Sequence, residues 1–368
     1  MIWGNRISCR TIQFIRRKIM KRISVFLLVL VMVLSFVGAA GSAEKGAAKE
    51  GPYIGFTIFD YTNTFVGYIR NGVNYHMKEQ YPGLEFMMVN GENDQATQTE
   101  RIDTMINKGV DVLAVNPVDT SAGETIVAKA KAAGIPIVFF NRMPTLEVLN
   151  SYDKAWYVGL DALYQGQLEG EMVGDAWKKD SAKFDTNKDG VLQYVLMTGA
   201  PGHSDATDRA NGFYAGVKAS GIPAQQLATQ PANWSTAMAV EVMNSWIGKF
   251  GDKIEMVVCS NDAMALGAVE ALRANGLITD KKAVPVIGVN ALPETAELIK
   301  SGVMLGSILT STYDTARAVI EISMNVANGK AADEGLEWTM KNKIVKIPEK
   351  KITVENVHEA IAGYKLAK

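Results

Sequence analysis

The 368-residue sequence has little of several features that define whole classes of protein. Its two cysteines, Cys9 and Cys259, cannot form a set of disulfides that holds a fold together. Its three histidines, His76, His203 and His358, are too few and too widely spaced for a zinc cluster. The net charge is only -1 and the pI is near 6.4, which argues against a nucleic-acid-binding protein.

The signature motifs of common enzymes are missing as well. The sequence has no Gly-x-Ser-x-Gly nucleophile elbow and no Gly-x-x-x-x-Gly-Lys-Ser/Thr phosphate loop. It also has no Gly-x-Gly-x-x-Gly after its first predicted strand. A pair of carboxylates in the setting of a glycoside hydrolase is not visible either. We therefore expect a binding protein and not an enzyme.

The hydrophobic run near the N-terminus is too short to span a bilayer comfortably. A basic stretch begins at Met20, residues 25–37 are apolar or small, and small residues continue to Ala43. This order is typical of a secretory signal peptide. We predict a signal peptide over residues 1–43, with Met20 as an alternative start, and a linker over residues 44–51. The protein is expected in the periplasm, and an uncleaved signal would tether it to the membrane.

From Tyr53 onward, short apolar runs alternate with helical patterns. Apolar strands joined by helices indicate parallel sheets that are covered on both faces. We therefore expect two doubly wound α/β lobes with a ligand cleft between them. The predicted strands are 53–59, 84–89, 112–115, 135–140, 192–198, a short one near 227, 256–260, 284–289, 307–309 and 343–347. The predicted helices are 65–80, 95–107, 122–133, 163–177, 205–220, 236–250, 263–275, 294–301 and 313–328.

Oxygen-bearing side chains alternate in the segment that ends at Gln193. Asp185, Asn187 and Asp189 match the first positions of an EF-hand calcium loop, and a glycine follows them. The twelfth position, which should carry a bidentate Glu, is Leu196, so calcium would need a carboxylate from elsewhere in the chain. A solvated Asp-Gly turn before a strand explains the same residues. The pattern alone leaves both interpretations open.

Polar and aromatic side chains follow the ends of most predicted strands. In a parallel sheet these ends meet at one edge, where ligands bind. Each residue alone fits a helix cap or a core position, but the set favours a ligand site. Two aromatic rings can hold the apolar faces of a pyranose while amides and charges bind its rim. The candidate ligand residues are Asn63, Phe65, Asn141, His203, Asp205, Arg209, Trp234, Asn261, Asn290 and Thr310.

Across residues 53–348 the sequence resembles the periplasmic galactose/glucose-binding proteins of bacterial ABC sugar transporters, which have the type I periplasmic binding protein fold. The segments that carry the resemblance are Val-Phe-Phe-Asn141, Ser-Tyr-Asp-Lys-Ala-Trp-Tyr-Val-Gly159, Asp-x-Asn-Lys-Asp-Gly190, Pro-Gly-His-Ser-Asp-Ala206, Asn-Asp-Ala-Met-Ala265 and Ala-Leu-Pro-Glu294. The resemblance implies that Phe65 and Trp234 stack on the sugar. It implies that the sugar's hydroxyls and ring oxygen are bound by Asn141, His203, Asp205, Arg209 and Asn261.

The resemblance also implies a calcium site and three departures from the family. Glu255 would supply the missing carboxylate. Asn63 and Asn290 stand where the family generally has Asp, and Thr310 where it has Asn. An amide loses the charge assistance that a carboxylate gives, so we expect a less acidic pocket, weaker binding, and Asp205 as the counter-charge for Arg209. The implied calcium ligands are Asp185, Asn187, Asp189, the carbonyl of Val191, Gln193 and Glu255.

The same resemblance implies the domain organisation and the partners. The N-terminal lobe would comprise residues 52–158 plus 312–346, and the C-terminal lobe residues 161–309 plus 348–368. Hinges are expected near 158–161, 310–313 and 346–348, and a helix over 354–362 would return to the C-terminal lobe. A monomer would close on D-glucose or D-galactose and be recognised by an ABC transporter permease, with a methyl-accepting chemoreceptor as a second partner. The alternatives are another monosaccharide, or a sugar-responsive repressor, which would need a helix-turn-helix where the signal peptide stands.

Overall fold

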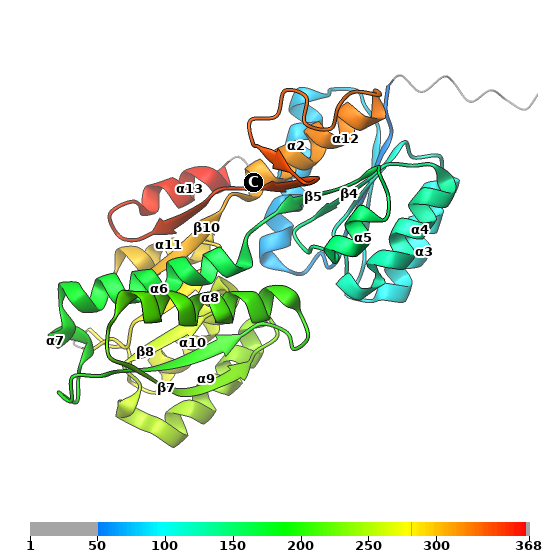
Figure 1. Cartoon of the computed structure of the whole chain (residues 1–368). Helices are drawn as coiled ribbons and strands as arrows, with labels where there is room; N and C mark the ends of the chain where they lie inside the picture. Colours follow the sequence, from blue (N-terminus) through cyan, green and yellow to red (C-terminus); the bar gives the residue numbers. More distant parts are fainter. Residues whose placement is uncertain (1–50, 281, 366–368) are drawn as a thin grey trace, which may run out of the picture. The chain divides into compact units, whose positions relative to one another are not determined.

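The computed structural model describes residues 51–280 and 282–365, and the predicted signal peptide lies outside them. The described chain alternates strands and helices (Figure 1). The strands are β1 (Ile54–Ile58), β2 (Phe86–Asn90), β3 (Val112–Val115), β4 (Ile137–Phe140), β5 (Ala155–Gly159), β6 (Leu192–Thr198), β7 (Ala224–Pro231), β8 (Met256–Cys259), β9 (Val286–Val289), β10 (Met304–Thr310), β11 (Met340–Lys341), β12 (Ile344–Lys346) and β13 (Glu349–Ile352). The helices are α2 (Thr64–Gln80), α3 (Gln95–Asn107), α4 (Gly123–Ala133), α5 (Leu146–Asn150), α6 (Ala162–Lys179), α7 (Ser181–Phe184), α8 (Ser204–Ser220), α9 (Thr236–Phe250), α10 (Asp262–Ala274), α11 (Pro293–Lys300), α12 (Thr312–Ala327) and α13 (Val357–Lys365), with short 3-10 turns at Thr120–Ala122 and Gly251–Lys253.

Two sheets define two lobes. The N-lobe sheet has the strand order β11-β12-β5-β4-β3-β1-β2, and the C-lobe sheet has the order β13-β10-β9-β8-β6-β7. The ladders are parallel except where β11 pairs with β12 and where β13 pairs with β10. The fold class predicted from the apolar strands is therefore confirmed.

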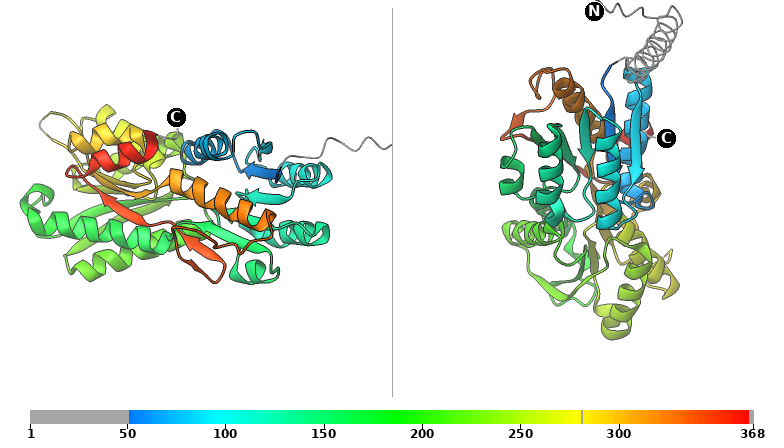
Figure 2. Two further views of the ribbon diagram at one scale, coloured as in Figure 1. Left: turned by 90° about the horizontal axis from the view of Figure 1, so that it is seen from above. Right: turned by 90° about the vertical axis from the view of Figure 1, so that its right-hand side faces the viewer.

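Helices cover both faces of each sheet (Figure 2). In the N-lobe, α2 and α12 pack on one face and α3, α4 and α5 on the other. In the C-lobe, α6, α7 and α8 pack on one face and α9, α10, α11 and α13 on the other. Strands such as β3 and β8 are buried along their whole length, which explains why they contain apolar residues only. Within the described residues, no helix has both the length and the apolar content needed to cross a bilayer.

Several elements escaped the sequence patterns. The short helix α5 and the strand β5 were not predicted, although β5 is almost entirely buried. Strand β13 reads Glu-Lys-Lys-Ile, and its charges suit its position at a sheet edge, so no apolar run marks it. The predicted C-terminal helix 354–362 is α13 in the structure and begins at Val357, because residues 354–356 form a turn.

The chain passes between the two sheets three times: from β5 to α6, from β10 to α12, and from β12 to β13. Glu349 connects two of these crossings, because its carboxylate accepts a hydrogen bond from the backbone N–H of Asp161 at 2.9 Å. The carboxylate of Asp161 forms an ion pair with Lys346. Burial raises the pKa of Glu349 to about 8. The first and third crossings are therefore tied to each other by side chains.

Helices α6 and α8 pack against each other through glycines. A Cβ added at Gly166 would lie 2.0 Å from the carbonyl oxygen of Arg209, and one added at Gly212 would lie 2.0 Å from that of Leu163. A side chain at either position would clash with the facing backbone and push α6 and α8 apart. The absence of a side chain at Gly166 therefore sets how deeply α8, with Arg209, sits against α6.

We predict that Gly166→Ala lowers the free energy of unfolding by about 1–3 kcal/mol, the usual cost of overpacking a tight core. Gly248 in α9 is the matched control, because a Cβ there meets nothing within 4 Å. Gly248→Ala should instead stabilise by roughly 0.5–1 kcal/mol through helix propensity. Denaturant unfolding followed by circular dichroism measures both. Equal effects of the two substitutions would contradict the packing argument.

Candidate ligand-binding site

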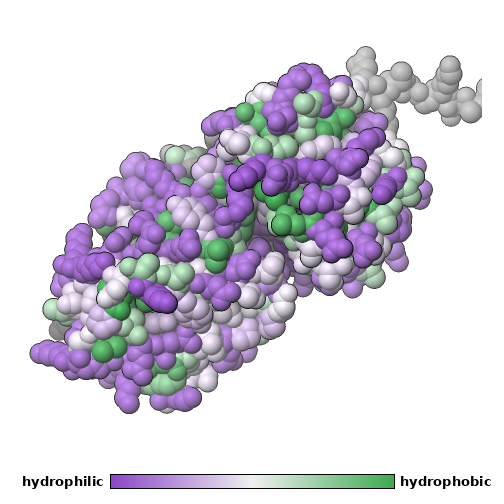
Figure 3. Space-filling model, in the orientation of Figure 1, coloured by the Kyte–Doolittle hydropathy of each residue, from purple (hydrophilic) through white to green (hydrophobic). Residues whose placement is uncertain are grey.

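A cavity lies between the two lobes, at the carboxyl ends of the parallel strands. The hollow is visible between the lobes in Figure 3, on a face that is mostly hydrophilic. Residues from both lobes line it, and nine of the ten predicted ligand residues are among them. These nine are Asn63, Phe65, Asn141, His203, Asp205, Arg209, Trp234, Asn261 and Asn290.

Three cavity residues have an uncommon backbone conformation. Asn141, Trp234 and Asn290 have φ values of 61°, 63° and 109°, in the region that side-chain-bearing residues rarely occupy. Hydrogen bonds hold two of them, since the Tyr157 hydroxyl donates to the carbonyl of Asn141 at 2.9 Å and the Tyr364 hydroxyl to that of Asn290 at 2.8 Å. The strained backbone at this edge is therefore supported by buried tyrosines.

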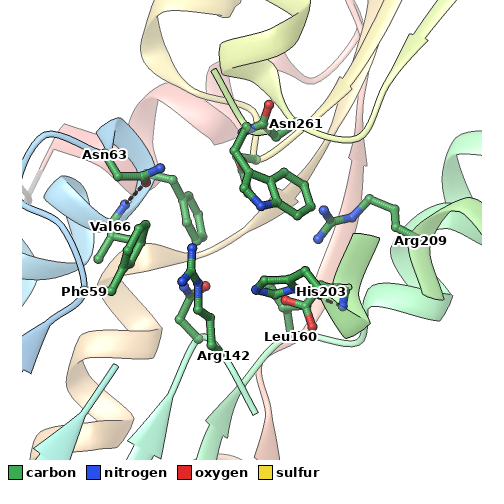
Figure 4. Close-up of a pocket in the computed structure, with 13 residues that line it drawn as sticks. Phe59, Asn63, Val66, Arg142, Leu160, His203, Arg209 and Asn261 are labelled. Carbon is green, nitrogen blue, oxygen red and sulfur yellow. Dashed lines mark hydrogen bonds between the residues drawn. The ribbon is translucent and has the colours of Figure 1, made fainter. Parts of the chain in front are cut away.

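Two cavity amides also cap helices. The side-chain oxygen of Asn63 accepts from the backbone N–H of Val66 at 3.1 Å, drawn as the dashed line in Figure 4. The side-chain oxygen of Asn261 accepts from Met264 at 2.9 Å in the same way. Because each oxygen serves its helix, the NH₂ group of each amide is the part left for a ligand. Asn63 and Asn261 therefore present hydrogen-bond donors.

The imidazole of His203 is neutral. Its Nδ1 accepts from the backbone N–H of Asp205 at 3.2 Å, which places the proton on Nε2. Burial, followed by the charges of Arg142 and Arg209, lowers the pKa of His203 to about 4. At neutral pH its Nε2–H is a donor, and its ring lies edge-on to Trp234 with centroids 5.6 Å apart.

Arg209 is fixed by neutral acceptors. Its Nε donates to the side-chain oxygen of Gln165 at 2.9 Å, and its Nη1 to the carbonyl of Ser260 at 2.8 Å. Gln165 in turn donates to the hydroxyl of Thr310 at 2.7 Å. Thr310, also predicted as a ligand residue, is not among the residues that line the cavity. Its hydroxyl instead holds Gln165 in place, and Gln165 in turn holds Arg209.

Among the described residues that line the cavity, Asp205 is the one carboxylate. Burial raises its pKa, whereas the guanidinium groups of Arg209 and Arg142 oppose that rise. Asp205 therefore interacts with Arg209 through charge alone. The hydrogen bonds of Arg209 go to Gln165 and Ser260.

Arg142 and Phe59 line the cavity but were missed from the sequence. The Arg142 guanidinium lies 3.7 Å from the centroid of the Phe59 ring, and its Nη1 donates to the carbonyl of Val118 at 2.5 Å. Burial lowers the pKa of Arg142 to about 10, so it stays charged at neutral pH. In Figure 4 the guanidinium groups of Arg142 and Arg209 both point into the cavity. The sequence could have indicated Arg142 as a cavity residue, because it directly follows Asn141 at the end of β4.

The predicted calcium ligands Asp185, Asn187, Asp189 and Val191 lie in the loop between α7 and β6. Gln193 lies in β6, and Glu255 lies just before β8. Asp185 accepts from the backbone N–H groups of Asp189 and Gly190, each at 3.0 Å. Glu255, distant in sequence, accepts from the backbone N–H of Gln193 at 3.0 Å. The side chains of Asn187, Asp189 and Gln193 lie 2.7–3.1 Å from one another, and the N–H of Val191 donates to Asp189. Hydrogen bonds among these groups therefore close the loop.

The donor set of this loop is mixed. In the part of the chain that the structure describes, no group of three or more His, Cys, Asp or Glu side chains is placed to hold a metal. The carboxylates of Asp185, Asp189 and Glu255 instead accept hydrogen bonds from backbone N–H groups and from the side-chain amides of Asn187 and Gln193. Hard oxygen donors of this kind suit calcium, which accepts carboxylate, amide and backbone oxygens together.

Comparison with known families decides the class of this two-lobed protein. The family described as periplasmic binding protein domain matches residues 54–331. The chain belongs to the periplasmic binding protein family. The members of this family that resemble it are named for the solutes they bind.

Other periplasmic binding proteins resemble it over most of their length. It is 37% identical over 325 residues to the D-galactose/methyl-galactoside binding periplasmic protein MglB of Haemophilus influenzae, which covers 88% of this chain and 96% of that protein. It is 29% identical over 323 residues to a xylitol-binding protein of Mycolicibacterium smegmatis, which covers 88% of this chain and 83% of that one. The resemblance to galactose/glucose-binding proteins is thereby confirmed.

A solved structure agrees with the fold. The ABC transporter solute binding protein of Bacillus halodurans with bound myo-inositol aligns with a TM-score of 0.70 and 27% identity. The alignment covers 86% of this chain and all of that one. The periplasmic binding protein fold therefore extends over both lobes.

Proposed function

We propose that this periplasmic binding protein captures D-glucose or D-galactose in the cavity between its lobes and delivers it to the permease of an ABC importer. The observation that carries the proposal is the cavity itself, where aromatic rings and polar side chains from both lobes meet. The relative that is 37% identical is named for galactose and methyl-galactoside, which supports a hexose.

The chemistry of the cavity suits a hydroxyl-rich ring. The NH₂ groups of Asn63 and Asn261 and the Nε2–H of His203 are donors to sugar oxygens. Asp205 accepts from sugar hydroxyls. Phe65 and Trp234 supply the apolar surfaces for the C–H faces of the pyranose. Since Asp205 is the single carboxylate among the described residues that line the cavity, we expect weaker binding than a site with several aspartates would give.

Capture would proceed by closure of the lobes about the three chain crossings. Sugar that contacts both lobes stabilises the closed form over the open one, and the permease recognises the closed form. A methyl-accepting chemoreceptor is a second candidate partner that would bind the closed form. The protein would act as a monomer in the periplasm, after export by the segment over residues 1–43.

We also propose that the loop from Asp185 to Gln193 holds a structural calcium ion. The ligands would be the side chains of Asp185, Asn187, Asp189, Gln193 and Glu255 with the carbonyl of Val191. Support comes from the convergence of these oxygen-bearing side chains on one loop, closed by the remote Glu255. Bound calcium would offset two of the three negative charges of Asp185, Asp189 and Glu255 and fix the loop that leads into β6.

The ligand assignment is tested by calorimetry on sugar-stripped protein. Its relatives are named for other ligands too, including xylitol and ribose, so the panel should contain D-glucose, D-galactose, D-ribose, D-xylose, xylitol and myo-inositol. We expect D-glucose or D-galactose to bind most tightly. If neither binds at about millimolar concentration while a pentose or a polyol does, the hexose assignment is wrong.

A further inference from the structure

The C-terminal helix α13 reaches a residue of the opposite lobe. It lies beyond the segment that matches the family, which ends at residue 331, and it packs on the C-lobe core through Val357 and Ala360. Its Tyr364 is 2% exposed, and the ring meets that of Tyr68 in α2 of the N-lobe, with centroids 4.6 Å apart and an interplanar angle of 65°. Figures 1 and 2 both show the end of α13 beside α2.

Tyr364 also touches the backbone of the ligand cavity. Its hydroxyl donates to the carbonyl oxygen of Asn290 at 2.8 Å. Asn290 lines the cavity and has a φ of 109°, a conformation that needs support from its surroundings. One buried tyrosine therefore joins a contact between the lobes to the position of a cavity residue.

Tyr68 makes a second contact across the lobes. Its hydroxyl donates to a carboxylate oxygen of Glu294, in α11 of the C-lobe, at 3.0 Å. Burial and then the charge of Glu294 raise the pKa of Tyr68 to about 12, so the phenol remains a donor at neutral pH. Tyr68 lies one turn after Phe65, so both contacts lie beside the cavity. Since α2 belongs to one lobe and α11 and α13 to the other, a movement that separates α2 from these two helices breaks both contacts.

We propose that Tyr68, Glu294 and Tyr364 form a latch that holds the closed, sugar-bound lobes together and slows the release of sugar. The latch rests on the proposed function, because it acts on lobe closure around a ligand. Its three residues are positioning residues, since none of them lines the cavity. A contact made only in the closed form slows dissociation and leaves association with the open form unchanged.

The variants Tyr68→Ala, Tyr68→Phe and Tyr364→Phe separate the parts of the latch. Stopped-flow tryptophan fluorescence with the tightest-binding sugar gives the association and dissociation rate constants. Tyr68→Ala, which removes the ring pair and the bond to Glu294, should raise the dissociation rate constant about three- to tenfold. Tyr68→Phe keeps the ring and should have a smaller effect, as should Tyr364→Phe, which frees only the carbonyl of Asn290. The association rate constant should stay within about twofold in all three.

Tyr214 of α8 provides the control, because it is a partly exposed tyrosine far from α2 in sequence and Tyr214→Ala should leave both rate constants unchanged. Combining Tyr68→Ala with Tyr364→Phe should raise dissociation by less than the product of the single effects, as expected for residues in contact. An unchanged dissociation rate in Tyr68→Ala would overturn the latch alone. A lower association rate constant in Tyr68→Ala, with the dissociation rate constant unchanged, would also overturn the latch. Failure of the wild-type protein to bind any sugar would overturn the proposed function, and the latch with it.

Discussion

Replacing Trp234 with alanine should weaken hexose binding by about 2–4 kcal/mol, the range of a strong aromatic contact at an interface. Trp234 lines the cavity beside His203, and the guanidinium of Arg209 lies 5.6 Å from its ring centroid. A sugar face that stacks on this indole would exclude water from both. Calorimetry measures the loss, and intrinsic fluorescence of the wild-type protein should change on addition of sugar.

Two control substitutions test whether the loss of affinity comes from the aromatic ring at this position. Trp234→Phe keeps an aromatic face and should recover most of the affinity. Trp338, which packs in the N-lobe with Arg317 at 4.5 Å from its ring, is a tryptophan outside the cavity, and Trp338→Phe should leave the affinity unchanged. Equal affinity of wild type and Trp234→Ala would place the indole outside the sugar contact.

Removal of calcium should lower the thermal stability of the protein. An ion that binds only the folded chain stabilises it by about 4 kcal/mol when its free concentration is about a thousand times its Kd. For a chain of this size, each kcal/mol corresponds to roughly 2–4 °C or less in Tm. Glu255→Gln should abolish the difference between chelated and calcium-loaded samples, because it removes the remote carboxylate.

Asp252 offers a matched control for the calcium experiment. It lies three residues before Glu255 but is exposed and paired with Lys282, so Asp252→Asn should keep the full response to chelator. Elemental analysis of the purified protein supplies an independent measurement. If the wild-type Tm does not respond to chelator and no calcium is detected, the loop is a turn closed by its own hydrogen bonds.

Much of the fold could be predicted because its strands are buried on both faces. β3, β6 and the helices α3 and α9 have the predicted bounds. β3 is the clearest case, since a parallel strand between two helical layers is apolar along its length. Strand β13 could not be found in this way. It forms an edge, carries Glu349 and two lysines, and is held by its pairing with β10.

The part of the cavity formed by residues at the ends of strands could be predicted, because these ends meet at one edge of each sheet. Nine polar or aromatic residues at these ends do line it, but Arg142 was missed. Asn141 has a positive φ, and the N–H of Arg142 donates to the carbonyl of Phe140 at 2.7 Å, so the chain turns tightly there. Consecutive residues then both face the cavity, which the alternation of a strand does not anticipate. Thr310 does not line the cavity, and its hydroxyl accepts a hydrogen bond from Gln165.

The three chain crossings also affect how the protein is made. The N-lobe sheet needs β12, and one of its faces is covered by α12, both of which come from the last quarter of the chain. The C-lobe needs β13 and α13, which come later still. Domains formed from one continuous segment can fold in turn as they are synthesised. Here neither lobe is complete until almost the whole chain has emerged, so both lobes must finish folding together, and a chain that stops before β12 completes neither.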